Sequence, residues 1–108
     1  MIAHVVTFAW RDGVTAEDTA GLSDALTTMA AGIPEVLFYR AGPNLRLRPN
    51  GADFGVIAIV ADQAGLDAYL DAPAHVEAVA RGIAPHLGTR QAVQLELDGA
   101  DLPAEWLA

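Results

Sequence analysis

The stretch from Asp67 to Val79, DAYLDAPAHVEAV, contains two side chains suited to acid–base chemistry. Tyr69 stands six positions before His75, and Pro73 lies between them. Because proline has no N–H to donate to the carbonyl four residues back, a helix through this stretch is predicted to kink or restart between the two side chains. A neutral histidine can take a proton from carbon next to a carbonyl, and a tyrosine hydroxyl can donate to the oxygen that becomes an enolate.

A third candidate, His4, lies in the apolar N-terminal run MIAHVVTFAW. The period of two predicts a strand over residues 2–10, with His4 on the same face as the bulky Phe8 and Trp10. On a helical wheel Tyr69 lies inside an apolar stripe and His75 lies at its edge. If the bulky strand face lies under the helices, the three polar side chains converge in one pocket. The expected substrate contacts in that pocket are Val6, Phe8, Val56 and Val79.

Four strands and two helical stretches are predicted to position these residues. After the first strand, Thr15 and Asp18 are spaced as a capping box, and a helix is expected from there to the stop at Gly32 and Pro34. Strands are predicted at 36–42 and 53–61. Asp62 is predicted to cap a second helical stretch, which is broken by Gly82, Pro85 and Gly88 before a last strand at 90–97.

This order predicts an α+β, ferredoxin-like βαββαβ fold, in which a four-stranded antiparallel sheet carries both helices on one face. The other face would be apolar and bare, with small residues from the first strand and with Ile57 and Ile59 from the third. A second copy of the chain is the economical cover, so two sheets are expected to form a dimeric α/β barrel. The domain is expected over residues 1–98. Residues 99–108 form a C-terminal tail, whose Trp106 is expected to dock on the body or on the partner.

Composition narrows the class of partner. The 108 residues carry a formal net charge of −8, which would repel nucleic acid and anionic membrane surfaces, so neither is expected as a partner. The chain has no cysteine, which excludes disulfides, thiolate nucleophiles and iron–sulfur ligation. The N-terminal apolar run has no basic segment before it and is too short to cross a bilayer. A cytoplasmic location is therefore expected.

Four short motifs carry a resemblance to a known family. HVVTFAW in the first strand, GPN at 42–44, the DF that opens the third strand and PAHV at 73–76 resemble the stress-responsive A/B barrel (Dabb) family over residues 2–97. The resemblance implies the same fold and a barrel-like dimer. Its members include stress-associated plant proteins, polyketide cyclases related to olivetolic acid cyclase, and many proteins without an assigned activity. The cyclase pattern of a first-strand His followed by a Tyr and a His on the second helical segment is similar to His4, Tyr69 and His75.

Structural roles compete with the catalytic ones. Each histidine could be a satisfied core residue bonded to a backbone carbonyl, and Tyr69 could be a core tyrosine whose hydroxyl reaches solvent. The two histidines lack a carboxylate at ligand spacing, so no metal site is expected, and no cofactor is expected either. His86 is expected to be exposed. Arg46 and Arg48 are either solvated or placed to meet a substrate carboxylate at the pocket mouth.

Three function classes therefore stay open. The first is an acid–base enzyme that acts on a small hydrophobic carbonyl compound, as an aldol-type cyclase or a lyase, with His75 as base, Tyr69 as donor and His4 as orienter. The second is a non-catalytic dimer that binds apolar ligands or protects cells under stress. The third is a cofactor-free monooxygenase, which Trp10 and Asn44 would suit.

Overall fold

The computed structural model describes residues 1–106. Its main elements are, in chain order, β1 (Ile2–Trp10), α1 (Leu22–Ala31), β2 (Val36–Pro43), β3 (Phe54–Val60), α2 (Gln63–Asp71), α3 (Pro73–Ala78) and β4 (Leu87–Glu96). A π-helical turn at Val79–Ile83 and a 3-10 turn at Ala84–His86 continue α3 toward β4. Two further 3-10 turns, Gly99–Asp101 and Ala104–Trp106, follow β4. No helix within residues 1–106 is long and apolar enough to cross a membrane.

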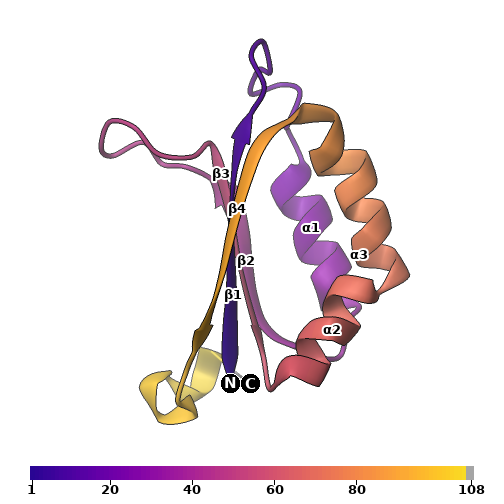
Figure 1. The fold of residues 1–108 in the computed structure, drawn as a ribbon, viewed down its shortest axis with the longest axis vertical. Helices are drawn as coiled ribbons and strands as arrows, with labels where there is room; N and C mark the ends of the chain where they lie inside the picture. Colours follow the sequence, from indigo (N-terminus) through magenta and orange to yellow (C-terminus); the bar gives the residue numbers. More distant parts are fainter. Residues whose placement is uncertain (107–108) are drawn as a thin grey trace.

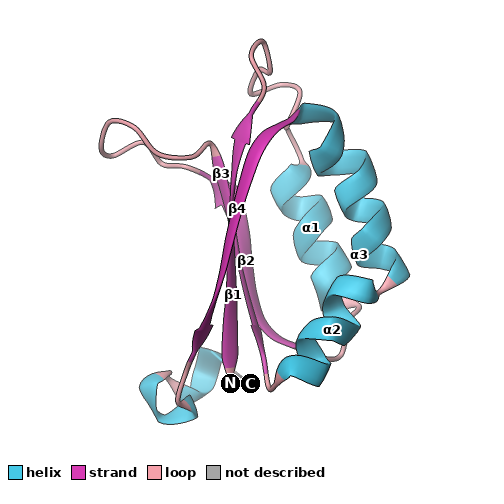
Figure 2. Cartoon of the chain, in the orientation of Figure 1, coloured by secondary structure: helices cyan, strands magenta, loops and turns pink. Residues whose placement is uncertain are grey.

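The four strands form one antiparallel sheet in the order β2-β3-β1-β4. All three helices lie on one face of this sheet (Figure 1), and Figure 2 shows the two layers that result. This is the predicted ferredoxin-like α+β fold. The central strands β1 and β3 are paired on both sides, so the residues they carry are held in a fixed register.

The register decides which side chains lie under the helices. In β1, His4 is opposite Ala58 of β3 and Gln94 of β4, and Phe8 is opposite Phe54 and Arg90. These positions share the helix-covered face, because side chains alternate along a strand. The core cluster joins Val6, Phe8, Phe54 and Val56 of this face to Leu22, Leu26 and Ala30 of α1 and to Tyr69 of α2. The predicted placement of the bulky face of β1 under the helices is confirmed.

The first helix begins later than predicted. Thr15 and Asp18 do form the reciprocal capping box: the Thr15 N–H donates to the Asp18 carboxylate at 2.8 Å, and the Asp18 N–H donates to the Thr15 hydroxyl at 3.3 Å. The bonded pair closes a turn, however, and α1 begins only at Leu22. Gly21 lies between them with a φ of 80°, a left-handed conformation that interrupts any helix and that glycine adopts at little cost.

The second helical stretch is broken at the predicted place. Asp62 caps α2 by accepting a hydrogen bond from the Gly65 N–H at 2.8 Å. The helix ends at Asp71, and Ala72 adopts an extended conformation with φ −58° and ψ 132°. Pro73 then occupies the first turn of α3, where its missing N–H costs nothing. The break between Tyr69 and His75 is confirmed.

The sheet face opposite the helices is only partly bare, which corrects the expectation of a wholly uncovered face. Ile57, Val93 and Leu95 are 41 to 50% exposed there, but Ala3 and Ile59, which lie in the same cross-strand row as Leu95, are buried within the chain. Figure 1 shows the turns after β4 on this side of the sheet, beside the N-terminus. The Met1 amino group donates to the Leu97 carbonyl at 3.0 Å, which ties the N-terminus to the segment that follows β4. The expected docking of Trp106 falls on a side chain outside those that the structure describes.

Candidate acid–base site

A cavity of about 200 Å³ lies between the sheet and the helices. His4 of β1, Tyr69 of α2 and His75 of α3 all line it, so the structure brings the three predicted polar residues together. Val6, Phe8, Val56 and Val79, the expected substrate contacts, line it as well. The rest of the wall is mainly apolar, from residues such as Leu26, Met29 and Ile83. The catalytic and binding roles of these residues stay predictions.

The break before α3 fixes the orientation of His75. Because the helix stops at Asp71, the Leu70 carbonyl is among the last four of α2 that lack a helical partner. His75 Nδ1 lies 3.0 Å from this carbonyl oxygen. A carbonyl oxygen only accepts, so Nδ1 carries the hydrogen of this bond. In the neutral ring Nε2 is then unprotonated and can accept a proton.

The surroundings of His75 favour its neutral form. Burial lowers the pKa of His75, the hydrogen bond to Leu70 raises it in part, and the positive charge of Arg90 lowers it further. The net result is a pKa below the ordinary value of about 6.5 for histidine. The ring is therefore in the base form at neutral pH. The bond from His75 to a backbone carbonyl, which the sequence analysis gave as the structural alternative, is compatible with a role as a base, because it uses only Nδ1.

His4 presents the complementary tautomer. It is 3% exposed, and its Nδ1 lies 2.8 Å from the amide nitrogen of Gln94 on the neighbouring strand. An amide nitrogen only donates, so Nδ1 of His4 accepts and Nε2 carries the hydrogen. Burial, Arg90 and His75 each lower the pKa of His4, in that order of size. His4 is therefore a neutral donor, which suits it to orient a carbonyl oxygen.

Tyr69 stands at the centre of the cluster. Its ring centroid lies 4.6 Å from that of His75, 6.4 Å from that of His4 and 6.3 Å from that of Tyr39. Burial raises the pKa of Tyr69, and a hydrogen bond from Tyr39 opposes this in part. The pKa of Tyr39 is raised as well, by burial first and then by its proximity to Tyr69. Both phenols keep their protons at neutral pH, so the Tyr69 hydroxyl can donate.

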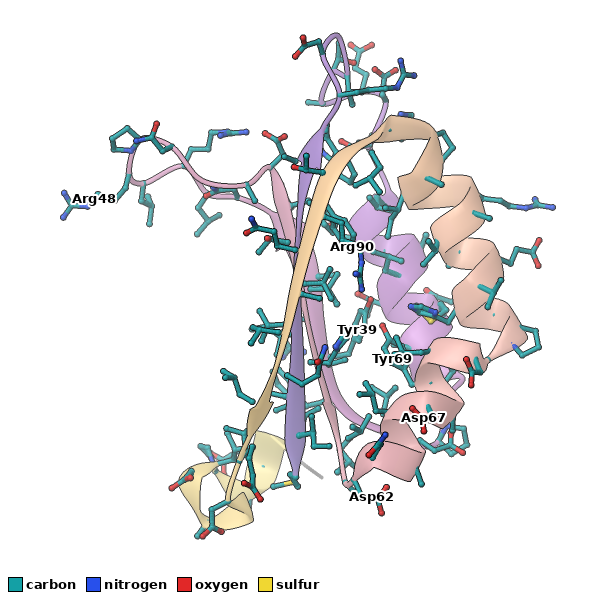
Figure 3. The ribbon with its side chains drawn as sticks, in the orientation of Figure 1. Tyr39, Arg48, Asp62, Asp67, Tyr69 and Arg90 are labelled. Atoms are coloured by element: carbon teal, nitrogen blue, oxygen red, sulfur yellow. The ribbon has the colours of Figure 1, made fainter. Side chains whose placement is uncertain are left out.

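Two polar residues of the cavity wall are absent from the sequence prediction. Tyr39 of β2 and Arg90 of β4 both line the cavity, and Figure 3 shows both on the helix side of the sheet with Tyr69. The signal lies in the strand register: Arg90 is opposite Phe8, and Tyr39 is opposite Ala58, which is itself opposite His4. Alternation along a single strand defines two faces but does not show which face the helices cover. The pairing with the neighbouring strands determines this.

Of the two readings of Arg46 and Arg48, the place at the cavity mouth is wrong and exposure to solvent is right, and the prediction that His86 is exposed is wrong. Arg46 pairs with Asp53 and lines a different hollow, of about 390 Å³, beside Trp10. Arg48 is exposed at the β2–β3 loop (Figure 3), so neither arginine lies at the mouth of the histidine cavity. His86 is half-buried rather than exposed, because its ring packs edge-on against Trp10 with centroids 6.4 Å apart.

No metal centre is found in the described part of the chain. Within residues 1–106 there is no group of three or more His, Cys, Asp or Glu side chains placed to hold an ion. The donors around the cavity are instead two imidazoles, two phenols and one guanidinium. This set can move a proton and stabilise negative charge on an oxygen.

Two enzymes share the fold at low sequence identity. A hydroxynitrile lyase from Passiflora edulis superposes with a TM-score of 0.74 at 13% identity, over 91% of this chain and 94% of that one. An antibiotic biosynthesis monooxygenase superposes with a TM-score of 0.69 at 14% identity, over 91% of this chain and 99% of that one. At these identities the likeness shows the fold alone.

Two bacterial proteins are more similar in sequence, and a family model covers most of the chain. A dimeric ferredoxin-like protein of unknown function from Thermobifida fusca is 40% identical, with a TM-score of 0.82 over 89% of this chain and 90% of that one. The uncharacterized protein SCO4036 of Streptomyces coelicolor is 33% identical over 82 residues, which is 74% of this chain and 84% of the relative. The model of the stress responsive A/B barrel domain, Dabb, matches residues 2–97. The chain therefore belongs to the Dabb family, as its motifs predict.

Proposed function

We propose that this protein is an acid–base enzyme that acts on a small hydrophobic carbonyl compound, in an aldol-type cyclisation or a lyase reaction. His75 is the general base, Tyr69 donates to the carbonyl oxygen, and His4 orients that oxygen through its Nε2–H. One observation carries the proposal: the Leu70 carbonyl holds the Nδ1–H of His75, which leaves Nε2 free as a proton acceptor beside the Tyr69 ring.

The first chemical step is the removal of a proton from carbon. Nε2 of His75 takes the proton from the carbon next to the carbonyl and becomes an imidazolium. The electron pair of the broken C–H bond forms a carbon–carbon double bond, and the carbonyl π pair moves onto oxygen. Donation from Tyr69 and His4 stabilises the resulting enolate in a site with little water, where such hydrogen bonds have a large effect. The enolate carbon then attacks a second carbonyl of the same molecule, or the imidazolium returns the proton.

The size and lining of the cavity support a small, apolar substrate. Its volume of about 200 Å³ falls below the range of about 300–1,000 Å³ typical for drug-sized ligands. Side chains such as Phe8, Leu26 and Val56 form much of its wall. The apolar wall also lowers the pKa of both histidines by burial, which keeps them in the neutral forms that the reaction needs.

Catalysis has precedent on this fold. A hydroxynitrile lyase and an antibiotic biosynthesis monooxygenase superpose on the chain over most of its length. These two activities differ, so they support a catalytic role for such a cavity without choosing the reaction. The choice of proton transfer rests on the histidine and tyrosine geometry of this chain.

We also propose that the working form is a twofold dimer joined through the open sheet face. Ile57, Val93 and Leu95 expose apolar surface there, and a contiguous apolar patch of this kind marks an interaction site. The Thermobifida fusca protein, 40% identical to this chain, is dimeric. Two open faces packed together would bury these residues in the centre of a barrel.

Exchange of carbon-bound hydrogen tests the catalytic proposal. Phenylacetone and a panel of small aromatic ketones are incubated with the protein in deuterium oxide, and loss of the proton signals next to the carbonyl is followed by NMR. Exchange is expected with the wild-type protein and is expected to fall about 10²- to 10⁴-fold in His75→Ala, the usual effect of removing a general base. Exchange that equals the buffer rate for every ketone would favour a non-catalytic ligand-binding protein, and exchange that survives in His75→Ala would exclude His75 as the base.

A further inference from the structure

Arg90 is the charged residue of the cavity wall. It lies on β4 opposite Phe8, on the face that the helices cover, and Figure 3 shows its side chain on that side of the sheet. It lines the cavity yet is itself exposed, so the guanidinium stands where the cavity meets solvent. Across residues 1–106 no acceptor or acidic group forms a hydrogen bond or ion pair with this side chain.

The other arginines have partners or lie away from the cavity, and Arg11, for example, donates from Nε to the Pro85 carbonyl at 2.9 Å. Arg46 pairs with Asp53, Arg81 pairs with Glu77 at 2.9 Å, and the Arg40 guanidinium lies over the Phe38 ring at 4.7 Å. Arg48 is exposed at the β2–β3 loop, away from the cavity. Arg90 thus combines two properties: it lines a cavity, and it has no partner of opposite charge.

The cavity has no negative charge of its own to balance Arg90. Its wall contains two histidines and two tyrosines but no aspartate or glutamate. Figure 3 shows Asp67 on α2 and Asp62 just before it, both lower in the view than Arg90 and Tyr69. In a chain with a formal net charge of −8, this cavity is a local site of positive charge. Arg90 is near enough to both histidines of the cavity that its charge contributes to the lowered pKa of His4 and of His75.

An arginine in this position matches one kind of ligand group. The guanidinium is planar, always charged and presents paired N–H donors that fit the two oxygens of a carboxylate. We infer that the substrate of this cavity is a small hydrophobic oxo-carboxylate, and that Arg90 recognises its carboxylate at the cavity mouth. This inference rests on the proposed function, whose substrate class it narrows from carbonyl compounds to oxo-acids.

The arrangement orders the substrate along the cavity. The carboxylate meets Arg90 near solvent, where its desolvation cost is small, and the apolar body packs against Phe8, Val56 and Val79. The carbonyl then lies deeper, within reach of Tyr69 and His4, and the adjacent C–H faces Nε2 of His75. Arg90 has no part in the proton transfer and acts as a specificity-determining residue.

The test compares two probes that share an apolar body and a ketone. Phenylpyruvate and phenylacetone differ in that a carboxylate of the first is replaced by a methyl group in the second. Dissociation constants for both are measured by NMR titration on the wild-type protein, on Arg90→Gln and Arg90→Lys, and on Arg48→Gln as the control. Arg90→Gln and Arg48→Gln each remove one positive charge and change the formal net charge from −8 to −9, so they differ only in position.

Wild-type protein is expected to bind phenylpyruvate about 10-fold more tightly than phenylacetone, the lower range for a hydrogen bond to a charged group because Arg90 is exposed. Arg90→Gln is expected to abolish the preference with phenylacetone binding unchanged. Arg90→Lys keeps the charge but loses the paired N–H donors of the guanidinium, so it is expected to retain part of the preference for phenylpyruvate. Arg48→Gln is expected to retain the full preference. A preference that survives in Arg90→Gln, that is lost in Arg48→Gln, or that is absent from the wild-type protein would overturn the inference, as would failure to bind phenylpyruvate.

The His75→Ala variant separates this inference from the catalytic proposal. If both are correct, His75→Ala loses hydrogen exchange but keeps the preference for phenylpyruvate. Binding that depends on Arg90 without any exchange in the wild-type protein would leave the carboxylate site standing and remove the catalytic role. If neutral ketones exchange in a way that depends on His75 but phenylpyruvate is not preferred, the catalytic role stands and the carboxylate site at Arg90 is removed.

Discussion

Tyr69 and His75 meet across the end of a helix, with ring centroids 4.6 Å apart and an interplanar angle of 58°. In a continuous helix, residues six positions apart point to different sides of the helix axis, because 3.6 residues complete each turn. The extended Ala72 and the restart at Pro73 remove this constraint. The same break frees the Leu70 carbonyl that holds the His75 ring. One local feature of the chain thus places the two side chains and sets the tautomer of the base.

Tyr69→Phe is expected to slow hydrogen exchange about 10- to 100-fold, because one hydrogen bond to the developing oxyanion is lost. The stability of the variant is expected to change by no more than about 1 kcal/mol, since the buried ring is kept and only the hydroxyl is removed. Tyr39→Phe is the matched control: it removes a phenol from the same pair and is expected to leave most of the exchange rate intact. Equal rate losses in both variants would mean that Tyr69 acts through packing.

Activity is expected to fall as the pH drops below about 6.5, because protonation of His75 removes the base. The midpoint is expected below the ordinary histidine value, since burial lowers the pKa of His75. Arg90→Gln is expected to move this midpoint upward, because the charge of Arg90 contributes to the lowering. The measurement is the exchange rate of phenylacetone against pH for both proteins. An unchanged midpoint in Arg90→Gln would show that its charge does not reach His75.

Stability is expected to fall over the same pH range. The pKa values of His4 and His75 are lower in the folded protein than the value of about 6.5 in the unfolded chain. The unfolded state therefore binds protons first, so stability is complete above about pH 6.5 and is lost as the pH falls toward the folded pKa values. Urea unfolding from about pH 7.5 to 5 measures this loss. It should be smaller in a His4→Gln, His75→Gln double variant, and an equal loss would assign the effect to other groups.

Gln94→Leu is expected to destabilise the protein by about 1–3 kcal/mol, because Nδ1 of the buried His4 loses its donor. Gln63→Leu, at an exposed position at the start of α2, is the control and is expected to change stability by less than about 0.5 kcal/mol. Urea unfolding of both variants tests this. Similar values for the two would show that the His4–Gln94 bond contributes nothing.

Val5→Asp is expected to disrupt the dimer, because it places an unpaired charge on the open sheet face opposite Ile57 and Val93. Val76→Asp makes the same change at a position of α3 that is 55% exposed, away from that face, and is expected to leave the dimer intact. Light scattering at micromolar concentration reports the mass of each. A wild-type monomer, or a Val5→Asp dimer as stable as that of Val76→Asp, would contradict the proposed interface.

Much of the fold and part of the site follow from local sequence signals. The alternation of β1, the Asp62 cap and the proline between Tyr69 and His75 each act over a few residues, so their effects could be predicted. The start of α1 could not, because the Thr15–Asp18 capping box forms as predicted but closes an isolated turn. The left-handed Gly21 that separates it from the helix gives no signal in composition alone.

The residues that the sequence prediction missed depend on contacts between distant segments. Arg90 lines the cavity because β4 pairs with β1 in the register that sets it opposite Phe8, and no pattern within residues 90–97 determines that register. Tyr39 meets Tyr69 through the pairing of β2 with β3. The sequence left open whether Arg46 is solvated or lies at the cavity mouth, and its pairing with Asp53, seven residues along the chain, holds it away from the cavity.

The tautomer of His75 is the most direct test of the account, because it requires no knowledge of the substrate. A nitrogen-15 spectrum correlated with the ring protons, recorded at about pH 7.5 where a histidine of lowered pKa is neutral, distinguishes the two ring nitrogens. We predict a protonated Nδ1 and an unprotonated Nε2, with the Nδ1 proton bonded to the Leu70 carbonyl. A protonated Nε2, or a fully protonated ring at this pH, would show that His75 cannot accept a proton in the cavity and would contradict its role as the base.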